Sequence, residues 1–268
     1  MDAIRGHGVS LSLTGRISLV TGGSRGIGAA TVRLFRQAGS LVCFSHQKSH
    51  EQADALVAEC GGEKFCRGVQ QHLKTAADGH ALVDGAVKAF GRLDCLVVNH
   101  GIWPSHDAPI SSMTEEQWRE TMAVNLDSVF GLVQAAVAQM EKQPAGADGV
   151  RGHIVLISST AGQRGEAFHA DYAASKGALI SLTKSLSSEL AAKRIYVNCV
   201  APGWVKTEMS QAALEDTETA KKILSGIPLG RVASPMEIAG PVLFLCTPLA
   251  GFVSGEIFNV NGGAVLTG

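Results

Sequence analysis

The chain carries few charged residues and no excess of either sign. Lys and Arg together number 23 and Asp and Glu 24 among 268 residues, a formal charge of −1, and there is no polybasic run. Because neutralising phosphates or anionic lipid requires clustered cations, we expect no nucleic-acid partner and no membrane partner. Charged residues make up only 18% and hydrophobic residues 46%, which excludes a disordered chain and permits burial between subunits.

Signals for export and for disulfide bonding are also absent. The first 13 residues, MDAIRGHGVSLSL, lack the charged-then-apolar order of a signal peptide, and the most apolar late stretch is interrupted by Pro241 and Pro248. The six cysteines include no CxxC pair, and Cys43, Cys95 and Cys199 lie in apolar runs typical of reduced core thiols. We therefore expect a soluble, cytoplasmic protein.

Short β-branched runs alternate with longer segments of helical periodicity. The expected strands cover 17–20, 41–44, 64–69, 93–99, 153–158, 195–200 and 256–260, and the expected helices cover 27–38, 51–60, 76–90, 114–140, 172–192 and 235–245. This order predicts an α/β fold: a doubly wound, seven-stranded parallel sheet with helices on both faces. We expect one domain over residues 14–268, preceded by an N-terminal extension of residues 1–13 and carrying a helical flap at about 204–227.

A glycine-rich turn follows the first expected strand directly. Residues 21–28 read TGGSRGIG and lead into a helix-forming segment. Glycines allow an anion to approach closely, and the N–H groups at the start of a helix face it, so this arrangement is typical of dinucleotide binding. The alternative is a glycine-rich turn that only lets the helix pack on the strand. Because false matches are fewer when the motif lies between a strand and a helix, we favour dinucleotide binding. The candidate cofactor-binding residues here are Gly22, Ser24, Arg25, Gly26, Ile27 and Gly28.

Tyr172 and Lys176 stand one turn apart at the start of an expected helix, on the same face. The chain has only 2 tyrosines, so a chance pair at this spacing is rare. A free phenol has a pKa of about 10, and acid–base work near neutral pH requires a lower value, which a fixed ammonium can supply in large part. The alternative is an amphipathic pair on a surface helix.

Two further polar residues stand at places that suit a site. Ser159 follows the expected strand 153–158, where open α/β sheets place ligand-binding residues, and its hydroxyl can donate to a developing oxyanion. Asn125 lies inside the apolar stripe of the expected helix 114–140 and must either bond a neighbouring backbone or serve a site. Either residue taken alone is more often structural.

Together, these motifs resemble the short-chain dehydrogenase/reductase family, and within it the subgroup that includes 3-oxoacyl-acyl-carrier-protein reductases. The resemblance covers the chain from about Thr14 to its end. Its motifs, in order, are TGGSRGIG at 21–28, VNHG at 98–101, Asn125, Ser159, Tyr172 with Lys176, APG at 201–203 with Thr207, and FNVNGG at 258–263. The resemblance implies a Rossmann-type fold and hydride transfer between a nicotinamide cofactor and a carbonyl carbon, for which no metal is needed.

The resemblance also implies a role for each site residue. Tyr172 would exchange a proton with the substrate oxygen that Ser159 holds. Lys176 would lower the pKa of Tyr172 and bind the nicotinamide ribose, and Asn125 would anchor a water in a proton relay. The further implied cofactor contacts are Asn99, Gly101, Pro202, Gly203, Val205 and Thr207.

The sequence departs from the family's pattern at three places. His100 replaces a small residue of the usual NNAG, and we interpret it as a packed histidine in preference to a catalytic one. His46 stands where NAD-preferring members carry Asp, and with Arg25 and Lys48 nearby this favours NADP(H) over NAD(H) as cofactor. At the third place, where members carry an Asp near the adenine, this chain has Gln71 or His72.

We predict an NADP(H)-dependent oxidoreductase that interconverts a ketone and a secondary alcohol, assembled as a homotetramer through helices 114–140 and 172–192. Two alternatives stay open: an NAD-dependent alcohol or sugar dehydrogenase with the same residues, and a dinucleotide-sensing regulator without turnover. The substrate is expected to be a small molecule, and the inserted loop 143–152 weakens the case for an acyl-carrier protein. The candidate substrate residues are Trp103, Arg164, His169 and Trp204.

Overall fold

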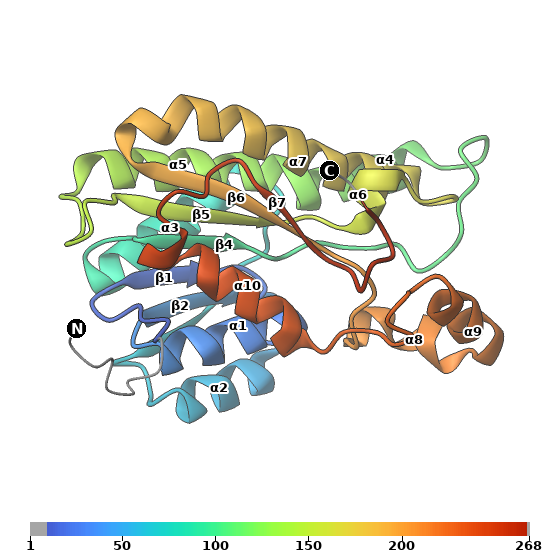
Figure 1. Ribbon diagram of the computed structural model, residues 1–268, viewed down its shortest axis with the longest axis horizontal. Helices are drawn as coiled ribbons and strands as arrows, with labels where there is room; N and C mark the ends of the chain where they lie inside the picture. The colour runs from blue at the N-terminus through green and yellow to red at the C-terminus, as the bar shows by residue number, and fades with distance from the viewer. Residues whose placement is uncertain (1–9, 267–268) are drawn as a thin grey trace, which may run out of the picture.

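Seven strands form one parallel sheet in the computed structural model, which describes residues 10–266 (Figure 1). The strands are β1 (Ile17–Val20), β2 (Leu41–His46), β3 (Cys66–Gln70), β4 (Cys95–Val98), β5 (Gly152–Ile157), β6 (Ile195–Pro202) and β7 (Ile257–Val260). Their order is β3-β2-β1-β4-β5-β6-β7, and every neighbouring pair is parallel. The predicted doubly wound sheet is confirmed. Because the chain crosses from β3 over to β4, a topological switch point lies between β1 and β4, where such sheets bind ligands.

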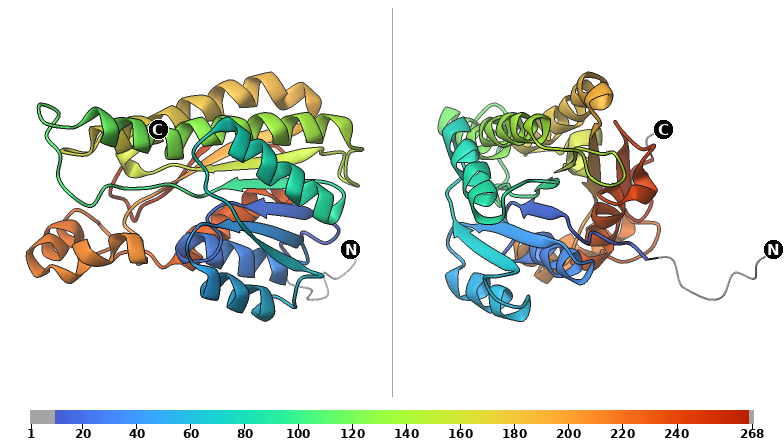
Figure 2. Two further views of the ribbon diagram at one scale, coloured as in Figure 1. Left: turned by 180° about the vertical axis from the view of Figure 1, so that it is seen from behind. Right: turned by 90° about the vertical axis from the view of Figure 1, so that its left-hand side faces the viewer.

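Helices cover both faces of this sheet, as the two views of Figure 2 show. One face carries α1 (Gly26–Gln37), α2 (His50–Glu59) and α10 (Pro235–Leu245), and the other carries α3 (Ala76–Phe90), α5 (Ser128–Lys142) and α7 (Ala170–Leu190). Successive strand residues alternate between the two cores: Val20 packs with the first helix set and Leu19 with the second. All six cysteines are buried and free, which confirms their interpretation as core thiols.

The helix expected over 114–140 is interrupted at its centre. The structure has α4 (Glu115–Met122), a π-helical turn (Ala123–Asp127) and then α5. A one-turn π segment inside an α-helix is rare and is frequently found at functional sites. By length and composition this continuous stretch is the one described helix that could cross a membrane, but half of its most apolar window is buried inside the protein.

Two segments complete the carboxyl edge of the sheet. A short helix that the sequence analysis did not predict, α6 (Thr160–Arg164), follows β5. The expected flap contains α8 (Glu208–Glu215) and α9 (Thr217–Ser225), which project beyond the strands in Figure 1. A bridge between Val205 and Ala233 ties the two ends of this flap together. Residues 1–9 of the expected extension lie outside the described residues, whereas Leu13 is buried in the core.

Candidate active site

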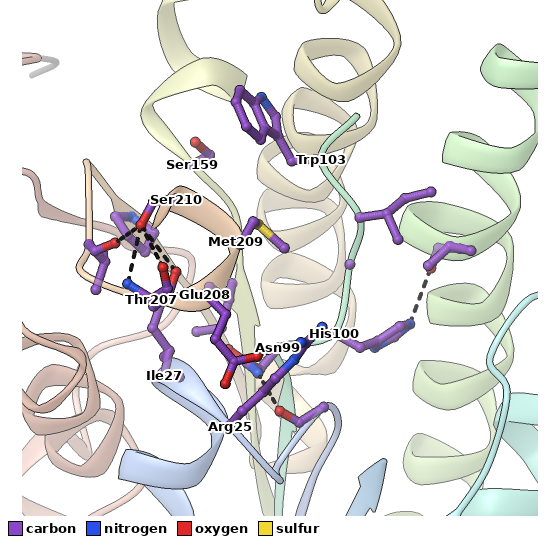
Figure 3. Close-up of a pocket in the computed structure, with 18 of the residues that line it drawn as sticks. Arg25, Ile27, Asn99, His100, Trp103, Ser159, Thr207, Glu208, Met209 and Ser210 are labelled. Carbon is purple, nitrogen blue, oxygen red and sulfur yellow. Dashed lines mark hydrogen bonds and ion pairs between the residues drawn. The ribbon is translucent and has the colours of Figure 1, made fainter. Parts of the chain in front are cut away.

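A cleft of about 580 Å³ lies over the carboxyl ends of the strands, at the switch point between β1 and β4. It is walled by the turn after β1, the end of β2, the segment after β4, the start of α7 and the first helix of the flap (Figure 3). Of the residues predicted to bind cofactor, the cleft is lined by Gly22, Ser24, Arg25, Gly26, Ile27, His46, Lys48, Asn99, Gly101, Tyr172, Lys176, Pro202, Gly203, Val205 and Thr207.

The glycine turn has a backbone that only glycine adopts readily. Gly22 and Gly26 have φ of +62° and +53°. At Gly28 a Cβ would stand 2.0 Å from the Gly22 carbonyl oxygen, so Gly28 supports the turn from behind. The Asn99 side-chain amide donates to the carbonyls of Thr21 (3.1 Å) and Gly22 (3.2 Å). Asn99 therefore braces the turn and also lines the cleft, and its contact with a cofactor stays a prediction.

His100 is held in place by contacts at both ring nitrogens. Nδ1 lies 2.8 Å from the Thr21 hydroxyl, and Nε2 lies 2.9 Å from the Ser128 hydroxyl. Burial, the largest cause, lowers the pKa of His100 to about 3, and the nearby Lys176 charge adds to the effect. The ring is neutral at physiological pH, which agrees with its interpretation as a packed histidine.

The end of β2 presents polar groups and no carboxylate to the cleft. His46 is buried, and its Nδ1 has no hydrogen-bond partner within the described chain. Burial, with a smaller contribution from the His50 charge, lowers the pKa of His46. Lys48 is exposed, and Arg25 forms an ion pair of 2.6 Å with Glu208 of the flap. The open glycine turn and the unpartnered His46 nitrogen fit a dinucleotide, whose phosphates and ribose hydroxyls would supply the missing partners.

Three predicted catalytic side chains converge in the same cleft. Ser159 caps α6, where its hydroxyl accepts from the Ala161 N–H (3.1 Å). Tyr172 lies in the first turn of α7, and Ser159 forms a side-chain hydrogen bond with its phenol. Lys176 lies one turn further along α7, where Nζ donates to the Ile157 carbonyl (2.8 Å) and stands 5.8 Å from the centre of the Tyr172 ring. Tyr172 and Lys176 thus both line the cleft, as expected of two residues on one helix face.

The charge states of this pair differ from the sequence-based expectation. Burial raises the pKa of Tyr172 to about 12; its bond with Ser159 opposes the rise, and the nearby Glu166 charge adds to it. Burial lowers the pKa of Lys176 to about 8. The expected lowering of the Tyr172 pKa by Lys176 is therefore not found in the chain alone, where desolvation of the phenolate is the largest influence on that pKa. At pH 7 the phenol is protonated and can act as a proton donor.

Asn125 occupies the π-helical turn and fixes the backbone after β4. Its Oδ1 accepts from the Ile102 N–H (2.8 Å), and its Nδ2 donates to the Ile102 carbonyl and to Ser175 (both 3.0 Å). A Cβ at Gly101 would meet Asn125 Oδ1 at 3.1 Å and Lys176 Nζ at 3.3 Å, so these groups form a tight floor. The sequence left open whether Asn125 bonds a neighbouring backbone or serves a site. The structure shows the backbone bonds, and the water relay stays a prediction.

The sequence analysis missed Asp171, which anchors α7 to α4. This carboxylate is fully buried, and its Oδ2 accepts from Thr121 (2.7 Å) and Gln117 (3.1 Å) of α4. The contact fixes the first turn of α7, and with it Tyr172, against α4. Its position next to Tyr172 in the sequence was the one available signal.

The outer end of the cleft holds the predicted substrate residues. Trp103, Arg164 and Trp204 line it, together with Glu166, which is not one of the candidate substrate residues. His169 is placed differently: it is buried against Trp103, and its Nε2 lies 2.9 Å from the Pro104 carbonyl. His169 therefore supports Trp103 and does not itself line the cleft.

This combination of fold and cleft defines a dinucleotide-binding α/β enzyme, and comparison with known proteins supports the assignment. A family model described as "Enoyl-(Acyl carrier protein) reductase" matches residues 22–265. The 3-oxoacyl-[acyl-carrier-protein] reductase of Synechocystis sp. is 38% identical over 259 residues, covering 95% of this chain and 99% of the relative.

Solved structures of similar proteins have the same fold. A short-chain dehydrogenase/reductase of the glucose/ribitol dehydrogenase type from Brucella melitensis superposes with a TM-score of 0.87 at 33% identity, covering 97% of this chain and 100% of that one. A putative 2-deoxy-D-gluconate 3-dehydrogenase from Agrobacterium tumefaciens with bound NADP superposes with a TM-score of 0.83 at 33% identity, covering 95% and 98%. The chain belongs to the short-chain dehydrogenase/reductase family and is an oxidoreductase of its 3-oxoacyl-acyl-carrier-protein reductase-like subgroup.

Proposed function

We propose that the protein reduces a ketone to a secondary alcohol with NADP(H), with Tyr172 as the proton donor. The observation that carries this proposal is the convergence of Tyr172, Lys176 and Ser159 in one cleft with the glycine turn. A phenol, an ammonium and a hydroxyl beside a dinucleotide site are the groups that carbonyl reduction needs.

Each residue has a defined part in this reaction. The nicotinamide ring, when bound, supplies or accepts the hydride at the substrate carbon. Ser159 donates a hydrogen bond to the substrate oxygen, and Tyr172 gives that oxygen its proton as negative charge develops there. Lys176 contributes a positive charge next to the phenolate that results. With its pKa raised to about 12, the Tyr172 phenol is protonated at neutral pH and so carries the proton that the substrate oxygen would receive.

The preference for NADP(H) rests on charge at the end of β2. Residues 45–49 line the cleft as Ser, His, Gln, Lys and Ser, so the end of β2 contributes no carboxylate that would repel a 2′-phosphate. Lys48 and Arg25 can each pair with that phosphate. The NADP bound to the Agrobacterium tumefaciens protein supports the same choice.

One observation favours NAD(H) as a second candidate. Arg25 is already paired with Glu208, and the unpartnered Nδ1 of the neutral His46 can accept from a ribose hydroxyl. A titration of the protein with NADPH and NADH, followed by a ketone panel read at the nicotinamide absorbance, separates the candidates. We expect tighter binding of NADPH, with turnover; tighter binding of NADH would assign the second candidate, and binding without turnover would indicate a regulator.

The protein is further proposed to be a cytoplasmic homotetramer. Six buried free thiols suit a reducing compartment. Large apolar side chains of α4 and α5 are partly exposed, including Trp118 (38%) and Phe130 (57%), and burying them between subunits would remove that surface from water. Sedimentation of the purified protein tests the assembly: a monomer would contradict it.

A further inference from the structure

The substrate end of the cleft is an aromatic corner, formed by Trp103 and Trp204. The two indole rings meet edge to face, with centroids 6.1 Å apart and planes at 82°. Trp103 is stacked on His169 at 4.9 Å and 15°, and His169 is fixed in turn by the Pro104 carbonyl. Figure 3 shows Trp103 facing the cleft near Ser159. The corner is thus a preformed apolar surface next to the catalytic hydroxyls.

Glu166 adds a carboxylate to this corner. It lines the cleft, is partly buried and accepts a hydrogen bond from the Trp103 side chain. Burial raises the pKa of Glu166, while the charges of His169 and Arg164 oppose the rise. Glu166 and Tyr172 line the same cleft, and the charge of Glu166 contributes to the raised pKa of Tyr172.

The unused capacity of this carboxylate points to its partner. Two carboxylate oxygens offer about four acceptor sites, and the Trp103 N–H occupies one of them. A partly buried acceptor that is left without donors loses hydration without compensation. The cleft therefore favours a substrate that brings hydrogen-bond donors beside its carbonyl group.

We propose that Glu166 is a specificity-determining residue and that it selects neutral polyhydroxylated ketones of the sugar class. A hydroxyl group next to the substrate carbonyl would donate to Glu166, while the C–H surface of the chain or ring packs on Trp103 and Trp204. This inference rests on the proposed function, since it takes Tyr172 as the group that protonates the carbonyl.

The same geometry disfavours a 3-oxoacyl thioester. The group beside its keto carbon leads to a second carbonyl, which has lone pairs and no donor. Facing Glu166, that oxygen would repel the carboxylate and leave it unpaired. The chain would thus differ in substrate from the curated relative with which it shares 38% of its residues.

Three ketones test the inference with NADPH as reductant. Erythrulose and butan-2-one share a four-carbon ketone skeleton and differ in three hydroxyl groups, and acetoacetyl-coenzyme A represents the thioesters. We expect kcat/KM for erythrulose to exceed that for butan-2-one at least tenfold. In Glu166→Gln this value should fall about tenfold, butan-2-one should stay within about twofold, and acetoacetyl-coenzyme A should improve.

Glu115→Gln is the matched control. It removes the same charge from an exposed carboxylate that does not line the cleft and is paired with Arg119 at 2.6 Å. It should leave the ratio of the three substrates unchanged, and NADPH titration checks that both variants keep the fold.

Each outcome has a separate meaning. Reduction of none of the ketones by the unmodified protein would contradict the proposed function and this inference with it. Reduction that favours butan-2-one or acetoacetyl-coenzyme A would leave the proposed function standing and overturn the inference. A preference for erythrulose that Glu166→Gln does not reduce would also overturn the role of Glu166.

Discussion

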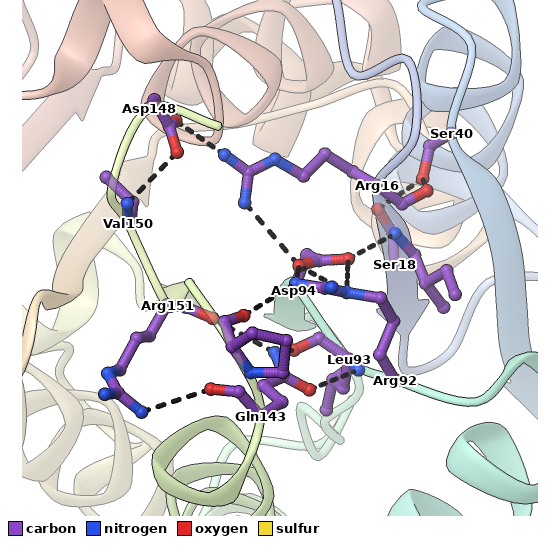
Figure 4. Close-up of polar contacts among 12 residues, drawn as sticks. Arg16, Ser18, Ser40, Arg92, Leu93, Asp94, Gln143, Asp148, Val150 and Arg151 are labelled. Carbon is purple, nitrogen blue, oxygen red and sulfur yellow. Dashed lines mark hydrogen bonds and ion pairs between the residues drawn. The ribbon is translucent and has the colours of Figure 1, made fainter. Parts of the chain in front are cut away.

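The polar groups at the two ends of the parallel sheet differ in access: Asp94 and His153, whose ring nitrogens lack partners within the described chain, are sealed in the core at the amino end, whereas His46 at the carboxyl end lines a cleft. At the amino end, Asp94 is fully buried, yet it accepts from the Ile17 N–H (2.9 Å) and from Arg92 (2.7 Å) and lies 3.5 Å from Arg16 (Figure 4). Arg16 is paired in turn with Asp148. At the carboxyl end, polar groups open into a cleft, and His46 Nδ1 is left without a partner in the described chain.

This difference separates stabilising groups from functional ones. A buried charge is tolerated when other groups satisfy it, as the arginines satisfy Asp94. Groups that line a cavity and lack partners are available to a ligand. The amino end therefore holds the sheet together, while the carboxyl end is kept open for cofactor and substrate.

The largest expected effect on cofactor binding is at the glycine turn. In Gly28→Ala, the new methyl group would stand 2.0 Å from the Gly22 carbonyl oxygen and 2.7 Å from Asn99 Nδ2. We expect the turn to be displaced and NADPH affinity to fall at least about 100-fold, measured by fluorescence titration. Gly85→Ala, in the middle of α3 with nothing within 4 Å, is the control and should bind normally. Unchanged affinity in Gly28→Ala would separate the turn from the cofactor.

At the amino end, Asp94→Asn should destabilise the fold without altering the site. The substitution removes the buried carboxylate charge that Arg16 and Arg92 both contact. Its loss should lower the free energy of unfolding by about 3–5 kcal/mol. Urea denaturation measures the loss, and the exposed Asp84→Asn should show none. NADPH affinity of the folded variant should be unchanged; a large loss of affinity would contradict the division between the two ends.

Acid should affect stability through buried histidines. Burial lowers the pKa of His153, near the amino end, to about 4, and that of His100 to about 3, from 6.5. The unfolded chain therefore binds more protons as the pH falls below about 6.5, so stability is complete above that pH and declines towards pH 4. The loss from His153 is about 3 kcal/mol. Urea midpoints across this range test it: His153→Leu should flatten the decline and the exposed His106→Gln should not.

The smallest effect should come from the exposed cation at the cofactor end. Arg25→Ala removes one pairing group for a 2′-phosphate, so NADPH affinity should fall about tenfold while NADH affinity changes little. Arg33→Ala removes a cation that is engaged with Glu59 at 2.8 Å and serves as the control. Equal losses for both cofactors would mean that Arg25 serves the pyrophosphate or the flap instead.

The sheet and most of the site could be predicted because their signals are local. Strand and helix periods predicted all seven strands, and the glycine turn, Ser159, Tyr172 and Lys176 stand at positions that follow from the alternation of elements. The four-residue spacing of Tyr172 and Lys176 alone places both on one helix face.

The remaining features depend on contacts between distant segments. The π-helical turn accompanies bonds between Asn125 and Ile102, which no periodicity reveals, so one straight helix was predicted there. Glu166 lies in a loop where Phe168 has a φ of +66°, and its position depends on Trp103. The raised pKa of Tyr172 was missed for a similar reason: desolvation depends on the packed structure, whereas the sequence shows only the nearby lysine.

Turnover and NADPH affinity of Tyr172→Phe, measured on the same sample, test the central claim most directly. The substitution removes the hydroxyl that we propose as the proton donor and keeps the ring that packs in the cleft. We predict that kcat for ketone reduction falls by about 10³-fold or more, while the dissociation constant of NADPH changes by less than about threefold. Turnover within about tenfold of the unmodified protein would contradict the assignment of Tyr172 as proton donor.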